Sequence, residues 1–157
     1  MAFYKSKRHE KTLTPDEALA KLEHFCAYQE RCPKEVRNKL AQLGVRGETA
    51  DRIFGVLQGD GFFDEKRFAI AYAGGKFRIN RWGRVRIRQE LYIRDISPAV
   101  IGEALETIDE AAYLETLKQQ LEKKRGQYGA DNPRAREKTA AALIRAGFEQ
   151  ELVFKYL

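Results

Sequence analysis

Residues 64–91 read DEKRFAIAYAGGKFRINRWGRVRIRQEL, and their apolar positions give the first indication of the fold. Within this stretch Ala69, Ile70, Ala73 and Phe77 follow the spacing of side chains that share one face of an α-helix. The same spacing returns on both sides of the stretch. The chain therefore contains an internal repeat, which predicts a modular fold.

The repeat can be followed through three copies. The first-helix spacing recurs at Ala18, Leu19, Leu22 and Cys26 and again at Tyr113, Leu114, Leu117 and Leu121. Each copy continues with a pair of apolar residues five positions apart, at Leu40 and Val45, Leu91 and Ile96, and Leu143 and Phe148. A last apolar group closes each copy, at Ala50, Ile53 and Phe54, at Ile101, Ala104 and Leu105, and at Val153, Tyr156 and Leu157. We therefore predict three helices in each copy.

Residues typical of helix starts and helix ends stand where this prediction requires them. All four prolines stand where a helix would begin, because proline is tolerated at the first helical position and breaks a helix interior. Residues 14–17, Thr-Pro-Asp-Glu, also form a capping box. Gly44 and Gly147 stand just past the middle helices as helix ends, and Asp95 takes the same place in the second copy.

These features predict an all-α protein of three tandem three-helix repeats, stacked into an elongated, curved molecule. We place repeat 1 at residues 14–60, repeat 2 at residues 64–109 and repeat 3 at residues 110–157, after a basic flexible tail at residues 1–13. Three short helices bury little surface alone, so neighbouring repeats must complete the core. The alternative is a single irregular helical domain.

One segment also fits a different structure. Residues 76–80 and 84–88 alternate polar and apolar side chains, as β-strands do, so they could form a basic β-hairpin. The repeat instead places this segment on helices. We favour the helix, on which Arg81, Arg84 and Arg88 would share one face.

Charge is distributed in blocks along the 157 residues, which carry a formal net charge of +6. Residues 76–94 hold seven lysines and arginines against Glu90 alone, whereas residues 95–117 hold six acidic residues and no basic one. Residues 118–138 are basic again. Such blocks indicate faces of opposite potential, and hence oriented docking on an anionic partner.

The first basic block is the candidate site. Guanidinium groups stay charged and pair with phosphates or carboxylates through two parallel hydrogen bonds. A tryptophan among them could anchor an interface or stack on a base. A solvated helix face with arginine stems over apolar neighbours would have the same sequence. The candidate partner- or DNA-binding residues are Lys76, Arg78, Arg81, Trp82, Arg84, Arg86 and Arg88.

Other function classes receive little support. The chain has no P-loop, G-x-G-x-x-G or H-E-x-x-H motif, so we expect no enzyme and no cofactor. His24 and Cys26 fall among the core positions of the first helix, where we expect both to pack. Cys26 and Cys32 are too few for a disulfide framework or a zinc site and favour a reducing cytoplasm. We expect a monomer with no membrane segment.

The second repeat resembles a known family. Residues 63–69 and 76–84, followed by Ile87 and Leu91, are similar to the RecX regulatory proteins, in particular to versions from the Bacteroidetes branch with a K-F-R-x-N-x-W-G stretch. Residues 82–91 also match the family's K-G-x-x-R-I-x-x-E-L element, with tryptophan in place of its lysine. The likeness extends from about residue 15 to residue 157 and is weaker in the third repeat than in the second.

The resemblance implies a cytoplasmic modulator of the RecA recombinase, active in DNA repair, recombination and the SOS response. Members of the family bind the RecA–DNA filament in its groove and typically inhibit ATP hydrolysis, strand exchange and coprotease activity; they are not enzymes. For this chain we expect the RecA nucleoprotein filament as partner, with phosphate contacts to single- or double-stranded DNA through Arg81, Arg84 and Arg88. The alternative is a stand-alone basic DNA- or RNA-binding helical module.

Overall fold

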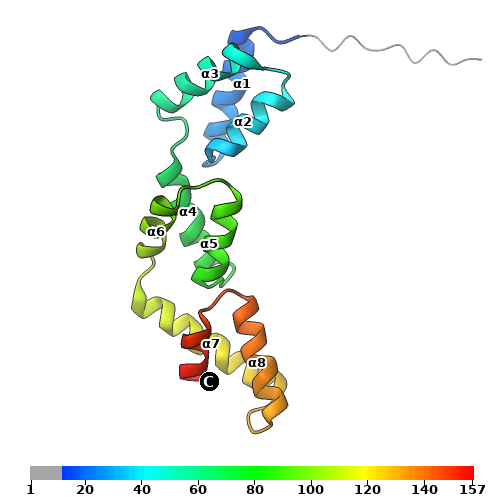
Figure 1. Ribbon diagram of the computed structural model, residues 1–157, viewed down its shortest axis with the longest axis vertical. Coiled ribbons are helices and arrows are strands. Elements are labelled where there is room, and N and C mark those ends of the chain that lie inside the picture. The colour runs from blue at the N-terminus through cyan, green and yellow to red at the C-terminus, as the bar shows by residue number, and fades with distance from the viewer. Residues whose placement is uncertain (1–11) are drawn as a thin grey trace, which may run out of the picture.

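The computed structural model describes residues 12–157, and every regular element in this range is an α-helix (Figure 1). Repeat 1 contains α1 (Pro15–Tyr28), α2 (Pro33–Gln42) and α3 (Gly47–Gly59). Repeat 2 contains α4 (Glu65–Arg78), α5 (Arg84–Ile93) and α6 (Pro98–Glu106). Repeat 3 contains α7 (Glu110–Tyr128), α8 (Pro133–Arg145) and α9 (Gln150–Tyr156). The predicted basic tail lies almost wholly outside the described residues.

The three groups of helices follow one another along the long axis, and the molecule is bowed, with its concave side to the right in Figure 1. The prediction of an elongated, curved stack of three-helix repeats is therefore confirmed. Within each group the helices pack mainly on one another, so that each repeat forms a separate layer of the stack.

The helix ends follow the predicted chemistry. Each proline is the first residue of its helix, and the Thr14 hydroxyl accepts a hydrogen bond of 3.2 Å from the backbone N–H of Glu17. Gly44, Asp95 and Gly147 each follow a middle helix and have φ angles of +77°, +59° and +101°. These left-handed residues turn the chain toward the third helix of each repeat.

The buried side chains repeat as predicted. Three matching positions of each first helix are buried, namely Ala18, Leu22 and Cys26, then Ala69, Ala73 and Phe77, then Tyr113, Leu117 and Leu121. They belong to two separate clusters, because repeat 1 has a core of its own whereas repeats 2 and 3 share one. The prediction that His24 packs in the core is wrong: its side chain is exposed beside Phe25, which turns partly inward instead.

The basic segment is helical as favoured, but it is not one continuous helix. The helix α4 ends at Arg78 and α5 begins at Arg84, so residues 79–83 form a loop. Arg81 in this loop has a φ of +58°, and the Trp82 N–H donates back to the Lys76 carbonyl over 3.1 Å. The predicted shared helix face of Arg81, Arg84 and Arg88 is therefore wrong. The chain must turn here to bring Gly83 against repeat 3.

The two junctions between repeats differ in chemistry. Between repeats 2 and 3, the N–H groups of Gly83 and Val85 donate to the carbonyls of Ala146 and Gly147, each over 2.9 Å. Between repeats 1 and 2, Cys32 packs into the core of the next repeat, and polar side chains add contacts, as between Arg67 and Glu30, whose Nε and Oε1 atoms are 2.8 Å apart. The apolar core therefore continues across the junction of repeats 2 and 3, whereas the junction of repeats 1 and 2 is mainly a surface contact.

Candidate binding surface on the concave side

Cationic and aromatic side chains alternate where α4 and its following loop meet α5. The guanidinium of Arg94 lies 4.8 Å from the centre of the Tyr72 ring, and the Lys76 ammonium lies 5.4 Å from the same ring. Lys76 is also 4.9 Å from the Trp82 ring, on which the Arg86 guanidinium stacks at 4.0 Å. We call these five residues the cation–aromatic ladder. Each contact is attractive, because the face of an aromatic ring is electronegative.

The ladder follows from helical spacing on both of its sides. Tyr72 and Lys76 are one turn apart on α4, and Arg86 and Arg94 are two turns apart along one side of α5. Glu90 between them accepts a hydrogen bond of 3.0 Å from Nη1 of Arg94. All five ladder residues are half-buried, and burial raises the pKa of Tyr72. The cations are thus held in place by their neighbours while their ends remain accessible.

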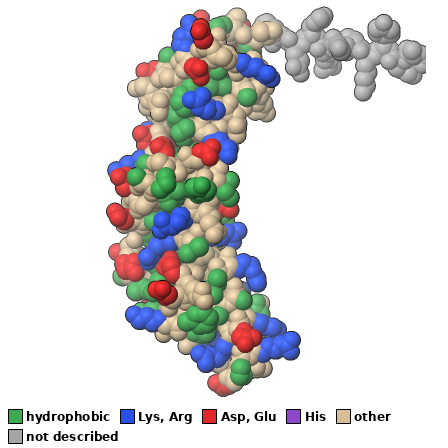
Figure 2. Space-filling model, in the orientation of Figure 1, with side chains coloured by type: hydrophobic (Ala, Val, Ile, Leu, Met, Phe, Trp, Pro, Cys, Tyr) green, Lys and Arg blue, Asp and Glu red, His purple; other side chains and the backbone are tan. Residues whose placement is uncertain are grey.

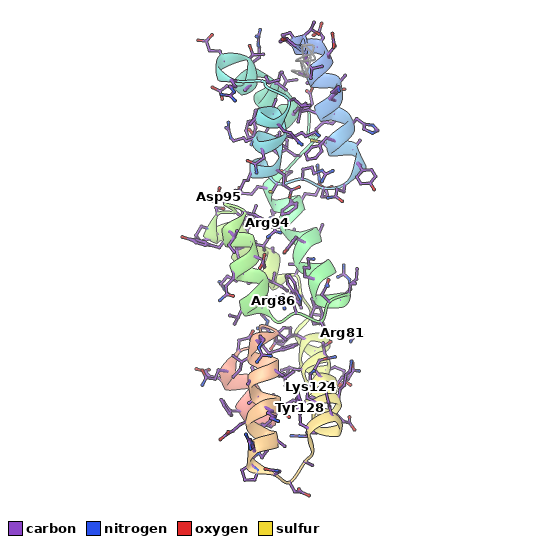
Figure 3. The ribbon with its side chains drawn as sticks, turned by 90° about the vertical axis from the view of Figure 1, so that its right-hand side faces the viewer. Arg81, Arg86, Arg94, Asp95, Lys124 and Tyr128 are labelled. Carbon is purple, nitrogen blue, oxygen red and sulfur yellow. The ribbon has the colours of Figure 1, made fainter. Side chains whose placement is uncertain are left out.

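The ladder lies on the concave side of the molecule. Figure 3 shows Arg94, Arg86 and Arg81 following one another down repeat 2, with Lys124 and Tyr128 continuing the line on α7. Arg81 is exposed in its loop, and its Nη1 atom lies 3.5 Å from Oε1 of Gln119 on α7. In Figure 2 lysine and arginine side chains also gather at the repeat 3 end of the molecule.

Three of the predicted site residues lie elsewhere. Arg84 is held by a 2.7 Å ion pair with Glu110, and its guanidinium stacks 3.8 Å from the centre of the Tyr113 ring. Arg84 and Arg88 line a hollow of about 550 Å³ whose far wall is acidic and consists of Glu106, Asp109 and Glu110. Arg78 lines a neighbouring hollow with Asp109. The candidate set therefore divides into Lys76, Arg81, Trp82 and Arg86 on the concave side, and Arg78, Arg84 and Arg88 against carboxylates.

The structure also adds residues that the sequence prediction did not include. Arg94 belongs to the same basic block, and its spacing from Arg86 could have placed it beside that residue. Tyr72 stands one turn before Lys76 and could have been found in the same way. Lys124 belongs to the second basic block of the sequence, but that it and Tyr128 follow the ladder along the same side depends on how repeat 3 stacks below repeat 2, which no local pattern indicates.

The described residues include neither a metal-binding cluster nor a membrane-spanning helix. Among residues 12–157, no group of histidine, cysteine and acidic side chains is placed to hold a metal ion. Within the same range, no helix has both the length and the apolar character needed to cross a bilayer. Cys26 and Cys32 are buried free thiols, and burial raises the pKa of both.

A stack of three-helix repeats with a cationic concave side is the class of protein that the fold and surface define. Comparison with known families then identifies the particular family. The profile of the second three-helix domain of RecX matches residues 64–105, and that of the third three-helix domain matches residues 111–157. The chain belongs to the RecX family of regulatory proteins, in agreement with the resemblance found in its sequence.

Individual relatives of this chain are also RecX proteins. The chain is 28% identical over 126 residues to the regulatory protein RecX of Stenotrophomonas maltophilia, covering 80% of this chain and 76% of that protein. It is 23% identical over 130 residues to RecX of Bacillus cytotoxicus, covering 82% of this chain but 48% of the relative. The chain therefore spans about half the length of the Bacillus relatives that it matches.

Solved structures share the fold. The crystal structure of RecX from Lactobacillus salivarius superposes with a TM-score of 0.82 at 21% identity, over 90% of this chain and 93% of that one. A second crystal structure of a regulatory protein RecX superposes with a TM-score of 0.79 at 22% identity, over 90% and 72% of the two chains. At this level of identity the match concerns the arrangement of helices.

Proposed function

We propose that this protein binds the RecA–DNA filament with its concave side and inhibits the recombinase, its ATPase and its coprotease activity. Membership of the RecX family supports the choice of partner. The observation that carries the proposal is the cation–aromatic ladder, which holds Lys76, Arg86 and Arg94 on the inner side of a bowed rod. A filament is a long convex anionic object, so a curved rod with inward cations fits along it.

Preorganisation is what distinguishes this surface from an ordinary basic face. A free arginine loses rotamer entropy when it binds, whereas Arg86, already stacked on Trp82, loses less. Guanidinium groups fixed in this way can pair with phosphate or carboxylate oxygens through two hydrogen bonds. Arg81, exposed at the edge of the ladder, extends the same surface toward repeat 3.

The test compares two double variants that remove the same charge from the same segment. Arg81→Ala with Arg86→Ala removes cations from the concave side, and Arg78→Ala with Arg88→Ala removes cations beside the acidic α6–α7 connection. We expect the first variant to need about tenfold more protein for half-maximal inhibition of the DNA-dependent ATPase of RecA, because several anchoring contacts are lost. We expect the second to inhibit like the parent protein.

Binding to bare DNA distinguishes the proposal from its alternative. A stand-alone nucleic-acid-binding module would bind single-stranded DNA tightly without RecA and would leave the ATPase unchanged at saturating protein. Under our proposal, inhibition occurs well below the concentration that binds bare DNA. If DNA phosphates contribute to filament binding, the affinity falls steeply as salt is raised. Equal inhibition by the two double variants, both with native circular dichroism, would reject the concave side as the binding surface.

A further inference from the structure

The three repeats differ at one structurally equivalent place, the hollow between the second and third helices. In repeat 2 the lining residues include Arg84 and Arg88 of α5 and Gly102 and Leu105 of α6. The residues at the same repeat positions in repeat 3 are Arg136, Ala140, Phe154 and Leu157, and they also line one groove. The residues of the two sets correspond because each stands at the same sequence distance from a matched buried residue, Leu91 in repeat 2 and Leu143 in repeat 3.

In repeats 1 and 2 an arginine of the second helix lies at this place. In repeat 1 the Arg37 guanidinium lies 3.9 Å from the centre of the Phe54 ring and 3.6 Å from Oδ1 of Asp51. Phe63, just before repeat 2, also packs on Phe54, with ring centres 4.9 Å apart. In repeat 2 the start of α7 closes the hollow, where Glu110 pairs with Arg84. Both places thus carry an arginine together with a carboxylate, although the hollow of repeat 2 keeps an open volume of about 550 Å³.

Repeat 3 keeps the groove but lacks the arginine that lies there in the other two repeats. Ala140 stands at the position of Arg37 and Arg88, so the groove is apolar there, and the side chains of Ile144 and Phe154 are 38% and 54% exposed. The groove between α8 and α9 has a volume of about 420 Å³, and its floor consists of Ala140, Ala141, Ile144, Phe154 and Leu157. Among residues 12–157 nothing covers it. We call it the repeat-3 groove.

The charges around the groove indicate what fits it. Arg136 lines its rim at the repeat position of Arg84, which in repeat 2 pairs with the acidic first residue of the incoming helix. Glu137 also lines the groove, but within the described range no carboxylate lies within ion-pair distance of Arg136. The surroundings are net positive, because the same two helices also carry Arg134, Lys138 and Lys155. An apolar floor with this arginine at its rim is complementary to a bulky apolar side chain that has a carboxylate next to it.

We propose that the repeat-3 groove seats such an apolar side chain from a protein partner, with the neighbouring carboxylate paired to Arg136. The inference rests on the proposed function, under which the partner is the RecA protein of the filament rather than its DNA. The cation–aromatic ladder and the repeat-3 groove then have separate tasks. The ladder meets anionic groups of the filament, and the groove supplies an apolar anchor at one end of the rod, where burial is independent of salt.

The test uses the full chain with Phe154→Asp, which places a charge on the groove floor. Val56→Asp on α3 is the matched control, because Val56 is a 41% exposed apolar residue far from the groove. We expect Phe154→Asp to weaken binding to preassembled RecA filaments about tenfold, as loss of a central apolar anchor does, and Val56→Asp to bind like the parent. Binding of bare single-stranded DNA should be equal in all three proteins. A photoreactive benzoylphenylalanine at position 154 should crosslink to the RecA protein.

The alternatives give different results. If the parent inhibits RecA and Phe154→Asp inhibits equally well, the groove inference is overturned and the proposed function stands. If the parent does not bind the filament at all, the proposed function fails instead. Equal loss of bare DNA binding, or a crosslink to DNA or to a second copy of this chain, overturns the choice of a protein partner. Arg136→Glu, at an exposed position, repeats the test should Phe154→Asp not fold.

Discussion

Tyr113 is the single side chain that connects repeats 2 and 3 most directly. It is fully buried at the start of α7, and its ring packs between Phe77 and Phe148 at centre distances of 5.7 and 5.5 Å. Its hydroxyl donates to Oε1 of Glu149 over 2.7 Å and accepts from the backbone N–H of Arg84 over 3.1 Å. Burial, aided by the hydrogen bond to Glu149, raises the pKa of Tyr113 well above its ordinary range.

We expect Tyr113→Phe to lower the free energy of unfolding by about 1–3 kcal/mol, because a carboxylate oxygen and a backbone N–H lose their partner in a buried site. Urea denaturation followed by circular dichroism measures the change. Tyr92→Phe is the control, since Tyr92 is 69% exposed on α5 and its hydroxyl has no comparable role. Equal stability of the two variants would show that the Tyr113 hydroxyl contributes nothing to the junction.

Cys32 gives a prediction about pH. Its thiol is fully buried and donates to Oε1 of Glu35, and burial raises its pKa from 9.0 to about 11. The unfolded chain loses this proton at lower pH than the folded protein, so stability is complete below pH 9 and declines as the pH rises to about 11. Between these values the unfolding free energy of the parent should fall more steeply than that of Cys32→Ala. Parallel pH profiles would contradict the prediction.

At the scale of elements, the approach of α5 to the end of α8 depends on two glycines. Gly83 precedes α5 and Gly147 follows α8, and their backbones lie against each other. A methyl group built on Gly83 would overlap the backbone of Gly147, and one built on Gly147 would overlap Arg86. Gly147 also has a φ of +101°, which other residues rarely adopt.

Gly83→Ala should therefore destabilise the protein by about 2–4 kcal/mol, because the overlapping groups are backbone atoms that cannot move without separating the repeats. Gly55→Ala provides the opposite control. Gly55 lies inside α3 with open space around its Cα, so alanine should stabilise that helix by about 0.5–1 kcal/mol. Thermal unfolding of both variants measures the difference, and a neutral Gly83→Ala would show that the junction is loosely packed.

The same junction shows where prediction from the sequence succeeds and where it ends. Helical spacing and caps are local, so most of the helices and buried residues could be predicted from the sequence alone, with His24 and the loop at residues 79–83 as exceptions. The direction of each arginine on α5 is not local: Arg84 turns toward Glu110 because α7 begins there, and Arg86 turns toward Trp82 because the loop bends at Gly83. The spacing of arginines within one helix does not show which residues of other elements they contact. The predicted site therefore included arginines from both sides of the helix.

At the scale of the whole molecule, the described chain contains two cohesive parts. Repeats 2 and 3 share one apolar core, whereas repeat 1 has a core of its own. Across the junction between repeats 1 and 2, only Cys32 among the described residues of repeat 1 joins the shared core, and Phe63 packs in the opposite direction. The remaining contacts are polar, and Lys34 exemplifies them, since its ammonium donates to the Ile93 carbonyl over 2.9 Å and lies 3.7 Å from Asp95.

Exposed ion pairs of this kind contribute roughly 0–1 kcal/mol each, far less than a continuous apolar core. We therefore expect native-state hydrogen exchange to show two opening reactions: amides of α1–α3 should exchange at a lower free energy than those of α4–α9. Arg67→Ala, which removes the ion pair with Glu30, should accelerate exchange in the residues flanking the junction and leave α7–α9 unchanged. Tyr113→Phe should do the reverse, lowering protection in α4–α9 while α1–α3 keep theirs. A single opening free energy shared by all nine described helices would mean that the polar junction couples the repeats as strongly as the shared core does.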